Sequence, residues 1–88
     1  WAMPSILLVD DDPGIRDLVS DFLSKHGYAV ETAEDGAAMD RALAGAERPF
    51  DLVVLDLMMP GENGLEIARR LSAKGGPAII MLSAMGED

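Results

Sequence analysis

Acidic residues gather in this sequence at places from which they could form one chemical site. Asp10, Asp11 and Asp12 follow one apolar run, Asp56 follows another, and Ser83 follows a third. Carboxylates that are brought together repel one another unless a cation joins them or one of them takes up a proton. Oxygen ligands without Cys or His favour a hard divalent ion, either Mg²⁺ or Ca²⁺. A Mg²⁺ held by few carboxylates keeps positions for water and for a phosphoryl oxygen, so the pattern points to phosphoryl-transfer chemistry.

The segments that must bring these residues together alternate between strand and helix. Two continuous apolar runs, 6–9 and 52–55, are typical of strands that are covered on both faces of a parallel sheet. The alternating run 28–32 predicts a strand near an edge, and 78–82 predicts a fourth strand. Helices are predicted from Pro13 to a stop at Gly27, from Gly36 to near Gly45, and between a cap at Asn63 and a stop at Gly75.

Apolar residues at helical spacing indicate the face that each helix turns towards the sheet. The first helix carries one wide stripe, and each of the other two carries a narrower one. We expect Met39 and Met81 to pack in the core. The three stripes are Ile15, Leu18, Val19, Phe22 and Leu23; Met39, Ala42 and Leu43; and Leu65, Ala68 and Leu71.

Four strands alternating with three helices predict right-handed βαβ units and an α/β fold, an open parallel sheet with helices on both faces. In such sheets a ligand lies beyond the carboxyl ends of the strands, where the strand order reverses. Asp10, Asp11 and Asp56 should therefore converge, whereas Asp12, next to Pro13, is explained as well by helix capping. We expect 4–88 to be one partial domain that stops after the fourth strand, and Trp1 and Ala2 to be additions ahead of a natural start.

Charge and composition exclude several classes of partner. The 88 residues carry a formal charge of −9 and no cysteine. An acidic chain lacks the Lys and Arg surplus that grips nucleic acid or an anionic membrane surface. The longest aliphatic run is far shorter than the roughly 20 residues that span a bilayer. The lack of cysteine permits a reducing compartment, and we expect the protein to be cytoplasmic.

Several segments, in this order, resemble the receiver domain of bacterial two-component response regulators, and the resemblance extends from Pro4 to the end of the chain. The turn after Asp56 is most similar to that of receivers fused to winged-helix DNA-binding domains. The resemblance implies a flavodoxin-like sheet of order 2-1-3-4, here without the fifth strand, its invariant Lys and the last two helices. The matching segments are ILLVDDD at 6–12, LVVLDLMMPG at 52–61, NGLE at 63–66 and IMLSA at 80–84.

Carried over to this chain, the resemblance assigns a role to each residue of the predicted site. Asp56 corresponds to the acceptor of a phosphoryl group from a sensor histidine kinase. Asp11 corresponds to a direct Mg²⁺ ligand, and Asp10 to an acid that holds the ion mainly through water. The backbone carbonyl of Met58 corresponds to a further ligand, and the Ser83 hydroxyl to a switch group that binds a phosphoryl oxygen. Such a domain is a phosphoacceptor and not an enzyme in its own right, although the full-length form can catalyse its own phosphorylation and dephosphorylation.

Two other hypotheses compete with the receiver. One is a Mg²⁺-dependent phosphoaspartyl hydrolase of the haloacid dehalogenase type, whose nucleophile and acid are spaced as Asp10 and Asp12 are; those enzymes usually carry Thr or Val where this chain has Gly14. The other is an interaction module. Its bare fourth strand would be an open sheet edge, so we expect self-association or domain swapping through that strand.

Overall fold

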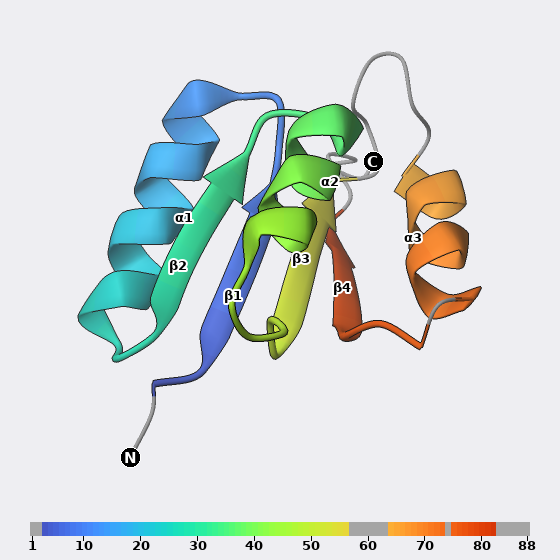
Figure 1. Cartoon of the computed structure of the whole chain (residues 1–88). Coiled ribbons are helices and arrows are strands. Elements are labelled where there is room, and N and C mark those ends of the chain that lie inside the picture. The colour runs from blue at the N-terminus through green and yellow to red at the C-terminus, as the bar shows by residue number, and fades with distance from the viewer. Residues whose placement is uncertain (1–2, 57–63, 74, 83–88) are drawn as a thin grey trace.

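Strands and helices alternate along the chain as the sequence predicts. The computed structural model describes residues 3–56, 64–73 and 75–82. The predictions for Trp1, Ala2, Met58 and Ser83 lie outside the described residues. In chain order the elements are β1 (Ser5–Val9), α1 (Pro13–Lys25), β2 (Ala29–Ala33), α2 (Gly36–Gly45), β3 (Leu52–Asp56), α3 (Gly64–Ala73) and β4 (Ala78–Leu82) (Figure 1).

The four strands form one parallel sheet in the order β2-β1-β3-β4, which confirms the predicted order and its flavodoxin-like topology. The two strands that contain the apolar runs, β1 and β3, are central, and the alternating strand β2 is at an edge. α1 covers one face of the sheet, and α2 and α3 cover the other (Figure 1). The order reverses between β1 and β3, so the ligand position expected for this architecture lies beyond Val9 and Asp56.

Local capping explains where the helices begin and end. The Asp12 side chain accepts hydrogen bonds from the backbone N–H groups of Gly14 and Ile15, and Pro13 occupies the first turn of α1. Gly27 follows the end of α1 with φ of 92°, in the left-handed region that glycine adopts without a steric penalty. Asp35 caps α2 by accepting from the Ala38 N–H at 2.8 Å. In the described turns from β1 to α1 and from β2 to α2, an Asp side chain thus caps the helix that follows.

The core consists of two apolar layers, one on each face of the sheet. The larger layer lies under α2 and α3, and the smaller lies under α1. Among the described residues no helix is long and apolar enough to cross a membrane. The buried members are Leu7, Val9, Ala33, Met39, Phe50, Val53, Leu55, Ile67 and Leu71 in the first layer, and Ile6, Leu8 and Val54 in the second.

Part of the predicted helix packing is wrong. Of the predicted stripe in α1, only Val19 and Leu23 pack against the sheet. The other three residues, Ile15, Leu18 and Phe22, are 42%, 71% and 58% exposed. The five-residue stripe is wider than the face that one helix buries, because its residues form two adjacent lines along the helix and only one line reaches the strands. In α3 the predicted Leu65 is exposed, and Ile67 is buried against the sheet in its place. Ala68 is partly buried and packs against the core, and Leu71 is buried, both as predicted.

Met81 was also expected in the core, and this expectation is wrong. Its side chain is 42% exposed, whereas Met39 is fully buried. The physical reason is the position of β4, which is an edge strand of the described sheet and has a neighbour on one side only. The two methionines are equally hydrophobic, so residue type alone does not distinguish the buried Met39 from Met81 on the edge strand.

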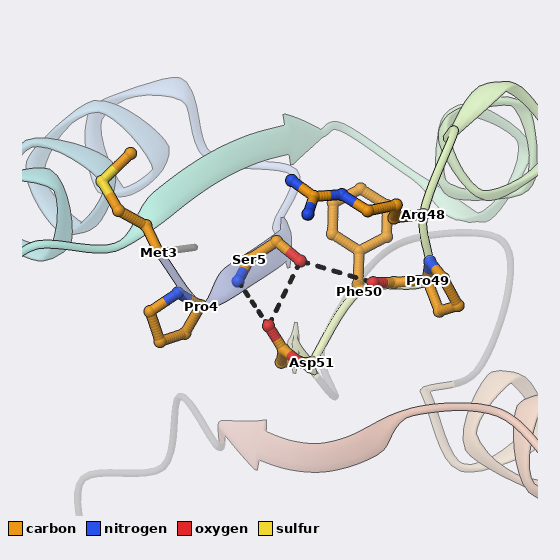
Figure 2. A pocket seen from close by; sticks show the side chains of 7 residues that line it. All are labelled: Met3, Pro4, Ser5, Arg48, Pro49, Phe50 and Asp51. Carbon is orange, nitrogen blue, oxygen red and sulfur yellow. Dashed lines mark hydrogen bonds between the residues drawn. The ribbon is translucent and has the colours of Figure 1, made fainter. Parts of the chain in front are cut away.

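A backbone clamp joins the amino ends of the two central strands. The Ser5 N–H donates to the Asp51 carboxylate at 2.7 Å (Figure 2). The Asp51 N–H donates to the Ser5 carbonyl at 2.8 Å. This pair stands at the start of a register in which Ile6 is level with Leu52 and Val9 is level with Leu55. The register places Asp10 beside Asp56 at the other end of the strands.

Candidate functional site

Three carboxylates converge at the carboxyl ends of β1 and β3. Asp10 follows the last residue of β1, and Asp11 comes directly after Asp10. Asp56 is the last residue of β3. Each of these three residues offers a carboxylate oxygen, and the three oxygens lie within 4.8 Å of one another. We call these residues the acid cluster. Their convergence confirms the juxtaposition that the strand pattern predicted.

The members of the acid cluster differ in their access to water. The side chains of Asp10 and Asp56 are almost wholly buried, at 3% and 9% exposure, while Asp11 is exposed. Burial raises the pKa of the Asp10 carboxyl above its ordinary value of 3.8, and the neighbouring charge of Asp56 raises it further. The Asp12 N–H, which donates to the Asp10 carboxylate at 2.9 Å, acts in the opposite direction but does not outweigh burial. Burial and the neighbouring carboxylate of Asp56 therefore both disfavour the ionised form of Asp10.

A hard divalent cation fits this donor set. Two oxygens that bind one Mg²⁺ lie at most about 4.2 Å apart, so the observed oxygens need only small side-chain rotations to share an ion. The donors are all carboxylate oxygens, and the exposed side of Asp11 leaves room for water ligands. Among the described residues Asp10, Asp11 and Asp56 are the ones that could hold Mg²⁺.

Asp12 does not join the acid cluster. Its carboxylate is occupied in capping α1, where it accepts from two N–H groups. The pairing of Asp10 with Asp12 that a phosphoaspartyl hydrolase would need is therefore not formed, and the capping interpretation of Asp12 is confirmed. The predicted roles of the Met58 carbonyl and the Ser83 hydroxyl fall outside the described residues.

The sequence analysis missed Arg16, which contacts the acid cluster through the backbone. Its Nη1 atom donates to the carbonyl oxygen of Asp10 at 2.7 Å. Arg16 lies in the first turn of α1, and helical side chains point back towards the amino end of their helix. A basic residue one turn after an acidic strand end is the sequence signal that could have indicated this contact.

A hollow at the other end of the strands is not part of this site. It has a volume of about 590 Å³ and is lined by residues at the amino ends of β1 and β3, including Ser5, Arg48 and Asp51 (Figure 2). Ser5 and Asp51 are hydrogen-bonded to each other there, and the acid cluster is at the opposite ends of the same strands. We therefore assign the chemistry to the acid cluster and not to this hollow.

Comparisons with known proteins agree with the arrangement of this site. Residues 6–88 match the family model of the response regulator receiver domain. The chain is 46% identical over 84 residues to the transcriptional regulatory protein ResD of Bacillus subtilis, an alignment that covers 94% of this chain and 34% of ResD. It is 44% identical over 88 residues to the DNA-binding dual master transcriptional regulator RpaA of Synechocystis, covering 97% of this chain and 36% of RpaA. The chain thus spans about a third of the length of the curated relatives it matches.

Solved structures show the same fold. The response regulator protein TrrA from Thermotoga maritima in complex with Mg²⁺-BeF is 40% identical and superposes with a TM-score of 0.84, covering 96% of this chain and 72% of TrrA. The complex of TrrA with the histidine kinase ThkA matches with a TM-score of 0.81 at the same identity, covering 97% of this chain and 72% of that one. No comparison favours the hydrolase alternative.

Proposed function

The chain belongs to the response regulator receiver family, and on that premise we propose that Asp56 accepts a phosphoryl group from a sensor histidine kinase in a Mg²⁺-dependent reaction. The observation that supports this most strongly is the acid cluster, in which oxygens of Asp10, Asp11 and Asp56 lie within 4.8 Å of one another where the strand order reverses. A receiver domain is a signalling switch, and phosphorylation of Asp56 would be its input.

The proposed reaction transfers a phosphoryl group between two side chains. An ionised Asp56 oxygen attacks the phosphorus of a phosphohistidine, a P–O bond forms, and the P–N bond breaks. The electron pair of that bond remains on the imidazole nitrogen, and Asp56 becomes an acyl phosphate. A bound Mg²⁺ supplies neutralisation of the negative charge on the phosphoryl oxygens.

The remaining residues of the site have supporting roles in this proposal. Asp11 holds the cation directly, and Asp10 holds it mainly through water. The Met58 backbone carbonyl is proposed as a further ligand. The Ser83 hydroxyl is proposed to bind a phosphoryl oxygen and so to convert phosphorylation into a change of shape. In the full-length form the same groups would support autophosphorylation and autodephosphorylation.

Partners follow from the family and from the relatives. The crystal structure of TrrA with ThkA supports a histidine kinase as the donor. Because the chain spans about a third of relatives such as ResD and RpaA, we propose that the whole protein carries an output domain that binds DNA. The phosphoryl group that a kinase hands on comes from ATP, so we propose a cytoplasmic location.

We also propose self-association through β4. Within the described residues β4 is an edge strand, and the side chains of Ile80 and Met81 are 51% and 42% exposed. An open apolar edge favours pairing with a second copy of the chain. Light scattering at high protein concentration should show a dimer that Ile80→Lys weakens and that Leu18→Lys, on the exposed side of α1, does not. A strictly monomeric chain would refute this.

The function is tested with a phosphoryl mimic and a phosphoryl donor. In the presence of MgCl₂ and beryllofluoride, the wild-type chain should be stabilised by about 2.7 kcal/mol at a ligand concentration of 100 Kd. Asp56→Asn should abolish this stabilisation, while Asp17→Asn, which removes an exposed acid from α1, should retain it. With acetyl phosphate, peptide mass mapping should find the label on Asp56. An equal response of wild type and Asp56→Asn would refute the proposed role of Asp56.

A further inference from the structure

Arg16 joins helix α1 to the backbone of the acid cluster. The side chain is half-buried, and its Nη1 donates to the Asp10 carbonyl oxygen at 2.7 Å. A hydrogen bond from a guanidinium is charge-assisted, and such bonds are shorter and stronger than those between neutral groups. This contact therefore holds the turn between β1 and α1 more firmly than an ordinary loop contact would.

The Arg16 contact completes a set of hydrogen bonds that holds Asp10 from three sides. The Asp10 N–H donates to the Ala33 carbonyl at the end of β2 at 3.0 Å. The Asp10 carboxylate accepts from the Asp12 N–H at 2.9 Å, within the turn itself. The Asp10 carbonyl accepts from Arg16. The strand, the turn and the helix thus each contribute one bond to the same buried residue.

The orientation of the Asp10 carbonyl matters for two carboxylates. This carbonyl belongs to the peptide unit between Asp10 and Asp11, and a peptide unit is planar. Rotation about the Cα–C bond of Asp10 would turn this unit, carry the Cα of Asp11 with it and change the direction of the Asp11 carboxylate. A donor that fixes the carbonyl therefore also fixes where both acids point.

We propose that Arg16 is a positioning residue for the divalent cation site, which acts by fixing the peptide unit between Asp10 and Asp11. This inference rests on the proposed function, because it concerns the Mg²⁺ that the acid cluster would bind. Arg16 itself does not touch the cation. Partners that orient ligand residues typically change metal affinity by about 10-fold or more when they are removed.

Because Arg16 is positively charged, the direction in which its removal changes the Kd for Mg²⁺ distinguishes two possible roles. If Arg16 acted only as a positive charge near the acid cluster, its removal would strengthen Mg²⁺ binding, because two cations repel. If Arg16 acts by positioning, its removal weakens Mg²⁺ binding despite the loss of that repulsion. The two interpretations therefore predict opposite changes in Kd.

The experiment is a titration of the full 88-residue chain with MgCl₂, followed by ¹H–¹⁵N NMR, which reports the fold and the Kd in the same spectra. Arg16→Met should raise the Kd about 10-fold. Arg16→Lys keeps the charge and one donor on a shorter side chain, so its Kd should lie between those of wild type and Arg16→Met. Lys25→Met, at the far end of α1, removes an exposed positive charge that pairs with Asp21 and should leave the Kd within about twofold, as expected for a surface ion pair.

Several outcomes would overturn the inference. An unchanged or lower Kd in Arg16→Met would exclude positioning. This holds even if the variant is less stable to urea in EDTA, because a purely structural role of Arg16 would lower stability without raising the Kd. If Arg16→Met does not fold, Arg16→Lys takes its place, and a wild-type Kd in that variant has the same meaning. If wild type binds no Mg²⁺, or if Asp56→Asn binds it equally well, the cation site of the proposed function fails and this inference fails with it. A wild-type site that depends on Asp56 but not on Arg16 would refute the inference alone.

Discussion

Neutralising Asp10 should stabilise the cation-free protein. Two unit charges 4.8 Å apart, the upper limit of the oxygen separations in the acid cluster, repel by about 1 kcal/mol in bulk water and by about 3.5 kcal/mol at an effective dielectric constant of 20. Asp10→Asn removes the repulsion with Asp11 and with Asp56. The amide oxygen of Asn can still accept from the Asp12 N–H, so the bond within the turn is kept. We expect the free energy of unfolding in EDTA to rise by about 1–3 kcal/mol.

The measurement is urea unfolding followed by far-UV circular dichroism at pH 7, in EDTA and again in MgCl₂. Asp17→Asn is the matched control, because it removes one exposed acid from α1 and should change stability by less than about 0.5 kcal/mol. Added Mg²⁺ should stabilise wild type more than Asp10→Asn, so the difference between the two proteins shrinks or reverses. An Asp10→Asn variant less stable than wild type in EDTA would refute the reasoning, since it would mean that the charged carboxylate supports the fold.

The difference in unfolding free energy between Asp10→Asn and wild type should depend on pH. The pKa of Asp10 is raised in the folded protein above its ordinary value of 3.8, so ionisation of this group opposes folding. The destabilisation is absent below the unfolded-state pKa and complete above the folded-state pKa. In EDTA the stability advantage of Asp10→Asn over wild type should therefore grow as the pH rises through that window and vanish in more acidic solution. An advantage that stays constant with pH would contradict the assignment.

Substitutions at four further residues test how the fold supports the site. Asp12→Ala should lower the free energy of unfolding by about 1 kcal/mol through loss of the α1 cap, and Asp12→Asn should restore most of it, since both Asp and Asn cap helices; urea unfolding of the two variants measures this. Asp51→Ala should cost about 1 kcal/mol because the Ser5 N–H loses its acceptor, and an unchanged unfolding midpoint would contradict the clamp. Met39→Ala should cost about 2–5 kcal/mol because the side chain is fully buried, whereas Met81→Ala, at 42% exposure, should cost less; equal losses would contradict the assigned burial.

Most of the fold could be predicted because each strand and helix carries its own local signal. The Pro after Asp12 and the Gly at 27 mark the two ends of α1, and the unbroken apolar runs distinguish β1 and β3 from the alternating β2. The acid cluster was predictable for a different reason. Parallel strands place all their carboxyl ends along one edge, so residues that follow two central strands must be neighbours.

Contacts that depend on which neighbours are present could not be read from the sequence. Leu18 and Met81 are as hydrophobic as the buried residues around them, and their exposure follows from the side of α1 that meets the sheet and from the edge position of β4. Arg16 is one of several basic residues, and only the folded turn brings its guanidinium to the Asp10 carbonyl. Spacing along the chain therefore predicted where the acid cluster lies, but it did not predict that Arg16 donates to the Asp10 carbonyl.

The direction of the parallel strands explains why carboxylates have opposite effects at the two ends of this sheet. At the amino ends the strands present N–H groups that no preceding turn has satisfied, and Asp51 finds such a donor in the Ser5 N–H. At the carboxyl ends Asp10 and Asp56 are buried beside each other, and the charge of Asp56 disfavours the ionised form of Asp10. Asp51 can thus stabilise the fold by itself, whereas the acid cluster needs a cation or a proton to do so. Asp51→Asn should therefore lower the free energy of unfolding, because it weakens the hydrogen bond at the amino ends of the strands. Asp10→Asn should raise it, because it removes charge repulsion at the carboxyl ends. The same urea experiment measures both changes.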